Sequence, residues 1–126
     1  MEKMRISASK YTPEIIYDPA TYTLSIEGES WPENAFDIYM PLLEKLEAYF
    51  RKPGQSLKVD VMLDLMNTSS RIMYRELINL LQRAHDEGHS VEMKWFYQAG
   101  DEDMQEDWEE LMEDCSLPYH IVEREE

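Results

Sequence analysis

The sequence is poor in basic residues, glycine and cysteine. Twelve Lys and Arg face 27 Asp and Glu over 126 residues, which gives a formal net charge of -15. Because an acidic chain is repelled by phosphate backbones, sequence-independent binding to nucleic acid is disfavoured. The four glycines are scattered, so the chain holds no glycine-rich phosphate loop. The single cysteine, Cys115, cannot form an internal disulfide bond.

Long apolar runs are also absent. No stretch approaches the roughly 20 apolar residues that cross a bilayer, and no basic segment followed by an apolar one would direct export. We therefore expect a cytoplasmic protein with no direct membrane insertion. The length predicts a single domain over residues 1–126, and a hydrophobic content of 43% is enough to build its core.

Acidic residues are concentrated at the C-terminal end. Residues 101–126 contain 12 acids and one base, whereas residues 1–100 contain 15 acids and 11 bases. Apolar residues recur at three- and four-residue spacing from Met104 to Met112, which predicts an acidic helix. The acids at 101–103 would then lie at the positive end of the helix dipole. This segment is either a solvated helix face or a docking strip for a basic partner.

Hydrophobic periodicity predicts five strands, at residues 14–17, 22–26, 58–66, 90–97 and 118–123. We expect Gly28 to end the second of these strands. In the third strand, alternation directs Val59, Val61, Leu63 and Leu65 toward the core.

Three helices are predicted between these strands. The first begins at the capping-box motif Ser30-Trp31-Pro32-Glu33 and is kinked near Met40, because Pro41 has no backbone N–H to donate. The second starts at the polar segment 67–70 and ends near Gly88, and the third is the acidic helix.

This order of elements predicts an α/β fold. An N-terminal antiparallel hairpin followed by alternating helices and strands gives one mixed sheet, with later strands parallel and joined by right-handed crossovers. The polar side of the third strand indicates that the helices lie mainly on one face. STAS-like regulatory domains, including anti-sigma factor antagonists, share this layout, although a fold alone does not determine function.

Few titratable residues are spaced for catalysis. His85 and His89 are four residues apart, but a glycine at the expected helix end separates them and disturbs a metal geometry. Asp60 and Asp64 share a strand face at a separation of about 13 Å, too far for a paired carboxylate site. Acids beside Cys115 raise the pKa of its thiol. We predict no enzyme, cofactor or metal site; an alternative is a small-molecule-binding or hydrolytic domain that uses Asp60 and Asp64.

The motif Asn67-Thr68-Ser69-Ser70 places three consecutive hydroxyls where a buried strand gives way to a helix. One interpretation is helix capping, for which Asn, Ser and Thr are all suited. The other is a phosphorylation switch, because a phosphate would add about -1.5 to -2 charges at pH 7. The free N–H groups of the helix start, together with Arg71 and Arg75, could stabilise that phosphate.

Five short motifs, taken together, are typical of one protein family. Trp31-Pro32-Glu33-Asn34 resembles its Tyr-Pro-Glu-Asn element, Asn67-Thr68-Ser69-Ser70 matches its phosphorylated turn, and residues 91–97 resemble its Val-x-x-x-Trp-x-Tyr strand. Thr12-Pro13-Glu14-Ile15 and Asp114-Cys115-Ser116-Leu117-Pro118 also match. These motifs span nearly the whole chain in the expected order, so the protein is similar to the SiaC family of bacterial regulatory phosphoproteins.

The resemblance implies a partner-switching circuit. A cognate serine/threonine kinase would phosphorylate Thr68, a PP2C-type phosphatase would reverse this, and the unmodified form would bind and activate a diguanylate cyclase. Cyclic di-GMP would then control aggregation and biofilm growth. The other residues expected to shape the turn or bind a partner are Trp31, Glu33, Asn34, Asn67, Ser69, Ser70, Arg71 and Arg75. An alternative partner is a sigma-factor-binding kinase, which would make the protein an anti-sigma factor antagonist.

Overall fold

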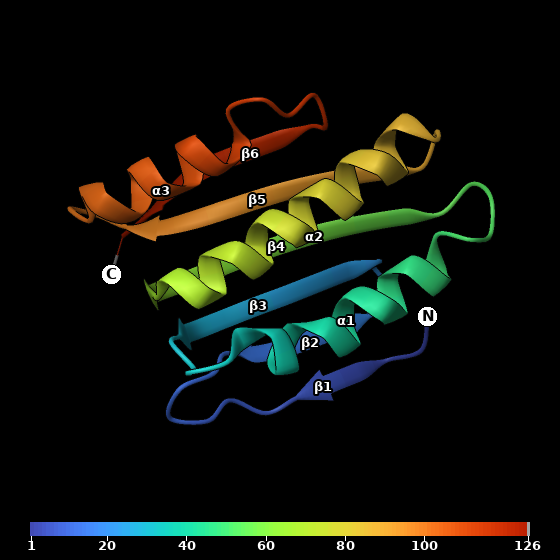
Figure 1. Ribbon diagram of the computed structural model, residues 1–126. Coiled ribbons are helices and arrows are strands. Elements are labelled where there is room, and N and C mark those ends of the chain that lie inside the picture. Colours follow the sequence, from blue (N-terminus) through green and yellow to red (C-terminus); the bar gives the residue numbers. More distant parts are fainter. Residues whose placement is uncertain (126) are drawn as a thin grey trace.

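The computed structural model describes residues 1–125, which form a six-stranded sheet covered on one face by three helices (Figure 1). The strands are β1 (Met4–Ile6), β2 (Glu14–Asp18), β3 (Thr23–Ser30), β4 (Ser56–Met66), β5 (Ser90–Gln98) and β6 (Tyr119–Arg124). The helices are α1 (Ala35–Tyr49), α2 (Thr68–Asp86) and α3 (Glu102–Met112). The short strand β1 was not predicted.

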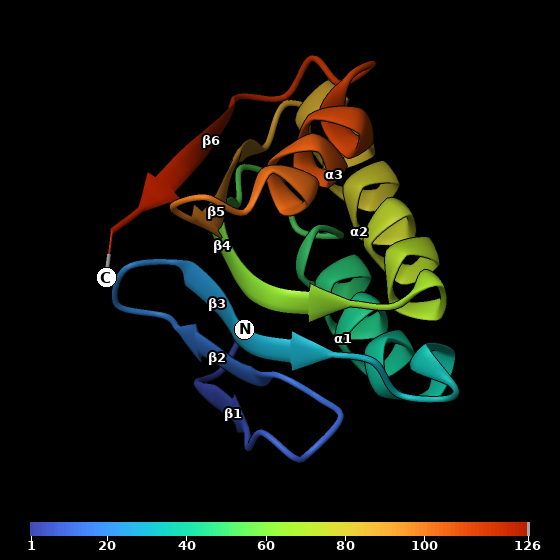
Figure 2. The ribbon, with the colours of Figure 1, turned by 90° about the vertical axis from the view of Figure 1, so that its left-hand side faces the viewer.

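The strands lie in the sheet in the order in which they occur in the sequence. The first three pair antiparallel, and β3 to β6 pair parallel. Figure 2, which views the sheet from its side, shows α1, α2 and α3 on the same face. The predicted α/β class is therefore confirmed, including the antiparallel start, the parallel strands and the one-sided helix layer.

The core lies between this helix layer and the sheet. Alternation in β4 buries Leu57, Val59, Val61 and Leu63, each no more than 2% exposed, against the helices. Two tryptophans, Trp95 of β5 and Trp108 of α3, are fully buried with ring centroids 4.6 Å apart. The opposite face of the sheet carries no helix, so its side chains remain partly accessible.

Two predictions about the ends of β3 and β4 are wrong because of a β-bulge. Gly28 does not end its strand, because β3 continues to Ser30. The register shifts between Gly28 and Glu29: Gly28 pairs with Leu63, whereas Glu29 pairs with Leu65. Gly28 has a φ of 129°, which a side chain would strain. The extra residue in β4 breaks the alternation, so Leu65, predicted to be buried, is 47% exposed.

The predicted capping box at the start of the first helix is wrong. Ser30 is the last residue of β3, and α1 begins five residues later at Ala35. Its N-cap residue, Asn34, makes no capping hydrogen bond with its side chain, and Glu33 is exposed. The Ser69 hydroxyl, which comes from the next helix, instead accepts a 3.0 Å hydrogen bond from the Ala35 N–H. The helix then continues through Pro41 to Tyr49.

Candidate functional site

The polar turn between β4 and α2 separates its three hydroxyls into three different environments. Thr68 is the first residue of α2, and its side chain is exposed. Ser69 is half-buried and caps α1 through the Ala35 N–H. Ser70 is fully buried, 2.7 Å from the Ser30 hydroxyl. Within residues 1–125, Thr68 alone of the three has a hydroxyl that makes no hydrogen bond, so it is the one open to a modifying enzyme.

Asn67 holds this turn in place from both sides. Asn67 is the N-cap residue of α2, and its side-chain oxygen accepts a 2.9 Å hydrogen bond from the Ser70 N–H. Its amide nitrogen donates to the Pro32 carbonyl at 2.8 Å, and its backbone N–H donates to the Ser30 carbonyl. The cap predicted for this segment is therefore present, and the segment after β3 is bound to the start of α2.

A buried chain of hydroxyls supports the turn from below. The Ser70 and Ser30 hydroxyls lie 2.7 Å apart, those of Ser30 and Tyr39 lie 2.6 Å apart, and those of Tyr39 and Tyr74 lie 2.8 Å apart. All four residues are at most 2% exposed. Burial raises the pKa of Tyr39 and of Tyr74, so both phenols stay protonated at neutral pH. This chain connects β3, α1 and α2 directly beneath Thr68, and sequence analysis missed it.

Arg71 and Arg75 point toward α3, where acidic side chains and a backbone carbonyl hold them. Arg71 donates to Asp107 at 2.8 Å and to Glu110 at 3.0 Å, forming two ion pairs. Arg75 donates to the Leu111 carbonyl at 3.2 Å. Part of the acidic helix therefore neutralises Arg71, the nearest cation to Thr68 along α2. Both arginines were predicted to contact a phosphate or a partner, and in this structure they join α2 to α3.

Large apolar side chains near the starts of α1 and α2 are exposed to solvent. Phe36, in the first turn of α1, is 57% exposed, and Ile72, one turn after Thr68 in α2, is 59% exposed. The hydrogen bond between Ser69 and the Ala35 N–H brings these two helix starts together. Leu65, three residues before Thr68 at the end of β4, is also exposed. We call Phe36, Leu65, Thr68 and Ile72 the Thr68 surface.

The segment after β3 lies beside this surface. Trp31 packs edge-on against Tyr11 with ring centroids 4.5 Å apart, and its indole N–H donates to Glu29 at 3.0 Å. The Asn34 amide donates to Asp37 at 3.1 Å, and Glu33 is exposed. The structure thus places the predicted 31–34 segment next to the turn, although Glu33 does not cap a helix.

The other candidate residues do not form a common site. Asp60 alternates along β4 with the buried Val59 and Val61, so it lies on the face of the sheet without helices, where burial raises the pKa of its carboxyl and Lys94 partly opposes this. His89 is buried and accepts a hydrogen bond from the Gln55 N–H through Nδ1. Burial raises the pKa of the Cys115 thiol, Arg75 partly opposes this, and Asp114 adds a smaller increase. No three His, Cys, Asp or Glu side chains in residues 1–125 are grouped to hold a metal ion.

The family described as SiaC family regulatory phosphoprotein matches residues 6–124. The chain belongs to the SiaC family. Within residues 1–125, none of the helices is both long and apolar enough to cross a membrane.

Solved structures from the SiaC family share the fold of this chain. SiaC of Pseudomonas aeruginosa superimposes with a TM-score of 0.88 at 30% identity, covering 98% of this chain and 100% of that chain. A chain in the structure of the diguanylate cyclase SiaD with its activator SiaC, from the same organism, matches with a TM-score of 0.90 at 31% identity. That match covers 96% of this chain and 99% of that chain. An uncharacterized protein of Pseudomonas aeruginosa strain UCBPP-PA14 is 32% identical over the full length of both.

Proposed function

We propose that this protein is a partner-switching regulator whose unphosphorylated form binds and activates a diguanylate cyclase. A cognate serine/threonine kinase phosphorylates Thr68, which abolishes binding, and a PP2C-type phosphatase restores it. Membership of the SiaC family and the likeness to a SiaC that is the activator of the cyclase SiaD support the choice of partner. The accessibility of the Thr68 hydroxyl, next to two engaged serines, is the observation that carries the choice of residue.

The Thr68 surface is suited to bind a partner in the unmodified state. Phe36 and Ile72 offer apolar area that a partner would remove from water, and such burial contributes roughly 25 cal/mol per Å². The Thr68 hydroxyl between them is small and neutral. A complementary helix or strand of the cyclase can therefore cover all three residues without leaving a charge buried.

Phosphorylation changes this surface without unfolding it. The phosphate would lie at the first turn of α2, where the helix dipole and free N–H groups favour an anion. Because Arg71, the nearest cation along α2, is already paired with two acids, it does not neutralise the added charge of about -1.5 to -2. Forcing that charge into an interface built around a hydroxyl costs several kcal/mol. A penalty of ~4 kcal/mol corresponds to roughly a thousandfold loss of affinity.

The test measures cyclase binding and cyclase activity with purified wild type, enzymatically phosphorylated wild type, Thr68→Ala and Thr68→Asp. Wild type and Thr68→Ala should bind and activate, whereas the phosphorylated protein and Thr68→Asp should do neither. Thr21→Asp is the matched control, because it adds the same charge at an exposed threonine in the turn before β3. Equal binding by phosphorylated and unmodified protein would rule out the switch, and no binding by any form would rule out the partner.

A further inference from the structure

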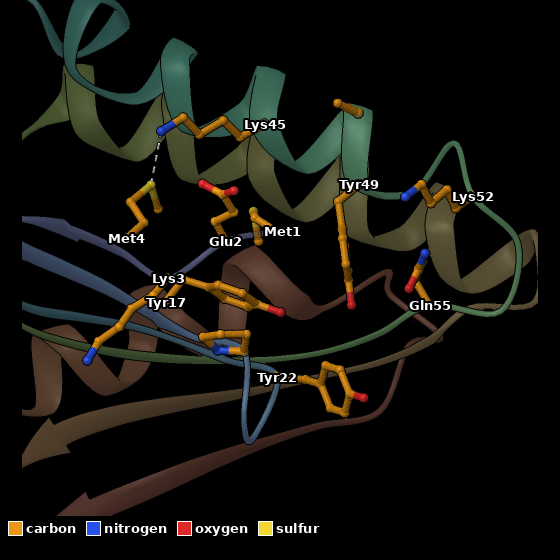
Figure 3. Close-up of a pocket in the computed structure, with 12 residues that line it drawn as sticks. Met1, Glu2, Lys3, Met4, Tyr17, Tyr22, Lys45, Tyr49, Lys52 and Gln55 are labelled. Carbon is orange, nitrogen blue, oxygen red and sulfur yellow. Dashed lines mark hydrogen bonds between the residues drawn. The ribbon is translucent and has the colours of Figure 1, made fainter.

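A pocket of about 650 Å³ lies at the end of the molecule far from Thr68, between the β1–β2 edge of the sheet and the C-terminal half of α1 (Figure 3). The pocket borders the start of β4, whereas Thr68 follows its end. The 11 residues of β4 separate the two by about 35 Å at roughly 3.3 Å per residue. The pocket is therefore separate from the Thr68 surface, and its volume is in the range of small-molecule sites.

Positive charge gathers at this pocket, although the chain as a whole carries a formal charge of -15. Lys3, Lys45 and Lys52 line it, and Glu2 is the one acidic residue in its lining. These are three of the six lysines in the sequence. None of the three forms an ion pair with another residue of the described chain. The nearest partner of Lys45 Nζ is the neutral Met4 Sδ at 3.5 Å.

The α1 side of the pocket is formed by the last turns of the helix and by the turn that follows it. Lys45 lies three and four residues before Ala48 and Tyr49, a spacing that aligns side chains along a helix, and Lys52 lies in the turn after α1 ends. The small side chain of Ala48 leaves room between the two lysines. Figure 3 shows Tyr49 extending from α1 toward the strands, with Lys45 and Lys52 on either side of it. The result is an aromatic side chain with one lysine on each side, the Lys45 ammonium group being directed toward Met4.

Tyr22 lines the strand side of the pocket in a strained conformation. Its φ is 57°, in the left-handed region, and it is the one residue other than glycine in residues 1–125 with a positive φ. A bulky side chain there is unfavourable, and a residue held in such a conformation points to a function. Tyr22 gains little from packing, because it is 49% exposed. Its ring is therefore available to stack on a ligand.

We propose that this pocket binds a phosphorylated aromatic metabolite of nucleotide size. Lys45 and Lys52 pair with the phosphate, Lys3 adds to the positive field, and the Tyr22 ring stacks on the aromatic group. A phosphate supplies the counter-charge that the three ammonium groups lack in the chain itself. The stacking partner accounts for a tyrosine at a position where the backbone favours glycine. The proposal does not depend on Thr68 or on the cyclase.

The experiment titrates AMP, GMP, CMP and UMP into the full chain by calorimetry, with the matching nucleosides and inorganic phosphate as separate arms. At least one mononucleotide should bind, and its nucleoside and inorganic phosphate should each bind at least tenfold more weakly. Raising the salt concentration should weaken binding, because the lysines are exposed. Absence of binding by all four mononucleotides overturns the proposal, as does inorganic phosphate binding as tightly as they do.

Two variants and one control locate the site. Lys45→Gln with Lys52→Gln should weaken mononucleotide binding at least tenfold. Lys10→Gln with Lys94→Gln, which removes the same two charges from exposed residues outside the pocket, should leave it unchanged. Tyr22→Gly should weaken binding at least fivefold while the melting temperature holds or rises, since glycine relieves the positive φ. Binding that survives either pocket variant overturns the proposal.

Discussion

Replacing Tyr39 by phenylalanine should destabilise the protein more than replacing Tyr74. The Tyr39 hydroxyl is the central member of the buried chain, 2.6 Å from the Ser30 hydroxyl and 2.8 Å from that of Tyr74. Tyr39→Phe removes both contacts and leaves the Tyr74 hydroxyl, on a fully buried residue, without a partner. We expect a loss of about 2–3 kcal/mol, from roughly 1 kcal/mol per net hydrogen bond plus the desolvation of the orphaned group.

Tyr74→Phe removes only the end of the chain, because Tyr39 keeps its contact with Ser30. Its expected cost is about 1 kcal/mol. Urea unfolding followed by tryptophan fluorescence measures both values. Tyr119→Phe is the control, because the Tyr119 hydroxyl makes no hydrogen bond within the described residues, and its effect should stay within about 0.5 kcal/mol. If Tyr74→Phe cost as much as Tyr39→Phe, the assignment of Tyr39 as the central member would be wrong.

Three further outcomes are expected. Burial, together with the neighbouring Tyr49, raises the pKa of Tyr17 to about 12, and burial raises that of Tyr74 well above its usual value. The unfolded chain releases these protons near pH 10 while the fold retains them, so the free energy of unfolding should fall above about pH 10, and less steeply in Tyr74→Phe. Asn67→Ala removes the N-cap of α2 and should lower stability by about 1–2 kcal/mol in thermal unfolding. Arg71→Gln should speed hydrogen exchange in α3, which it holds through two acids.

Much of the fold could be predicted because its signals are local. Alternation in β4 and helical spacing in α2 each lie within one continuous segment, and burial in the structure follows both patterns. The predictions were wrong where a contact with a residue distant in the sequence changes the local structure. The bulge opposite Gly28 exposes Leu65, and Ser69 caps a helix whose own motif at Ser30 had been assigned that role. Neither contact leaves a pattern along the chain.

In the candidate site, too, features with a local sequence pattern could be predicted, and contacts between distant residues could not. The polar turn could be proposed as a site because hydroxyls between a buried strand and a helix are visible in the sequence, and Asn67 caps α2 as expected, whereas the choice of Thr68 stays a prediction. The ion pairs of Arg71 could not be predicted, since its acidic partners lie 36 and 39 residues away, and its role toward a phosphate or a partner stays a prediction. The hydroxyl chain escaped notice for the same reason, because Ser30 and Ser70 are 40 residues apart.

The strand order has a consequence for how the chain assembles. Each strand pairs with the unpaired edge of the strand before it in the sequence, and no late strand must be inserted between two early ones. During synthesis, the portion already made can pair up to its last completed strand while the remainder is still emerging. Such stepwise growth keeps the loops that close at each stage short, which lowers the entropic cost of reaching the native topology.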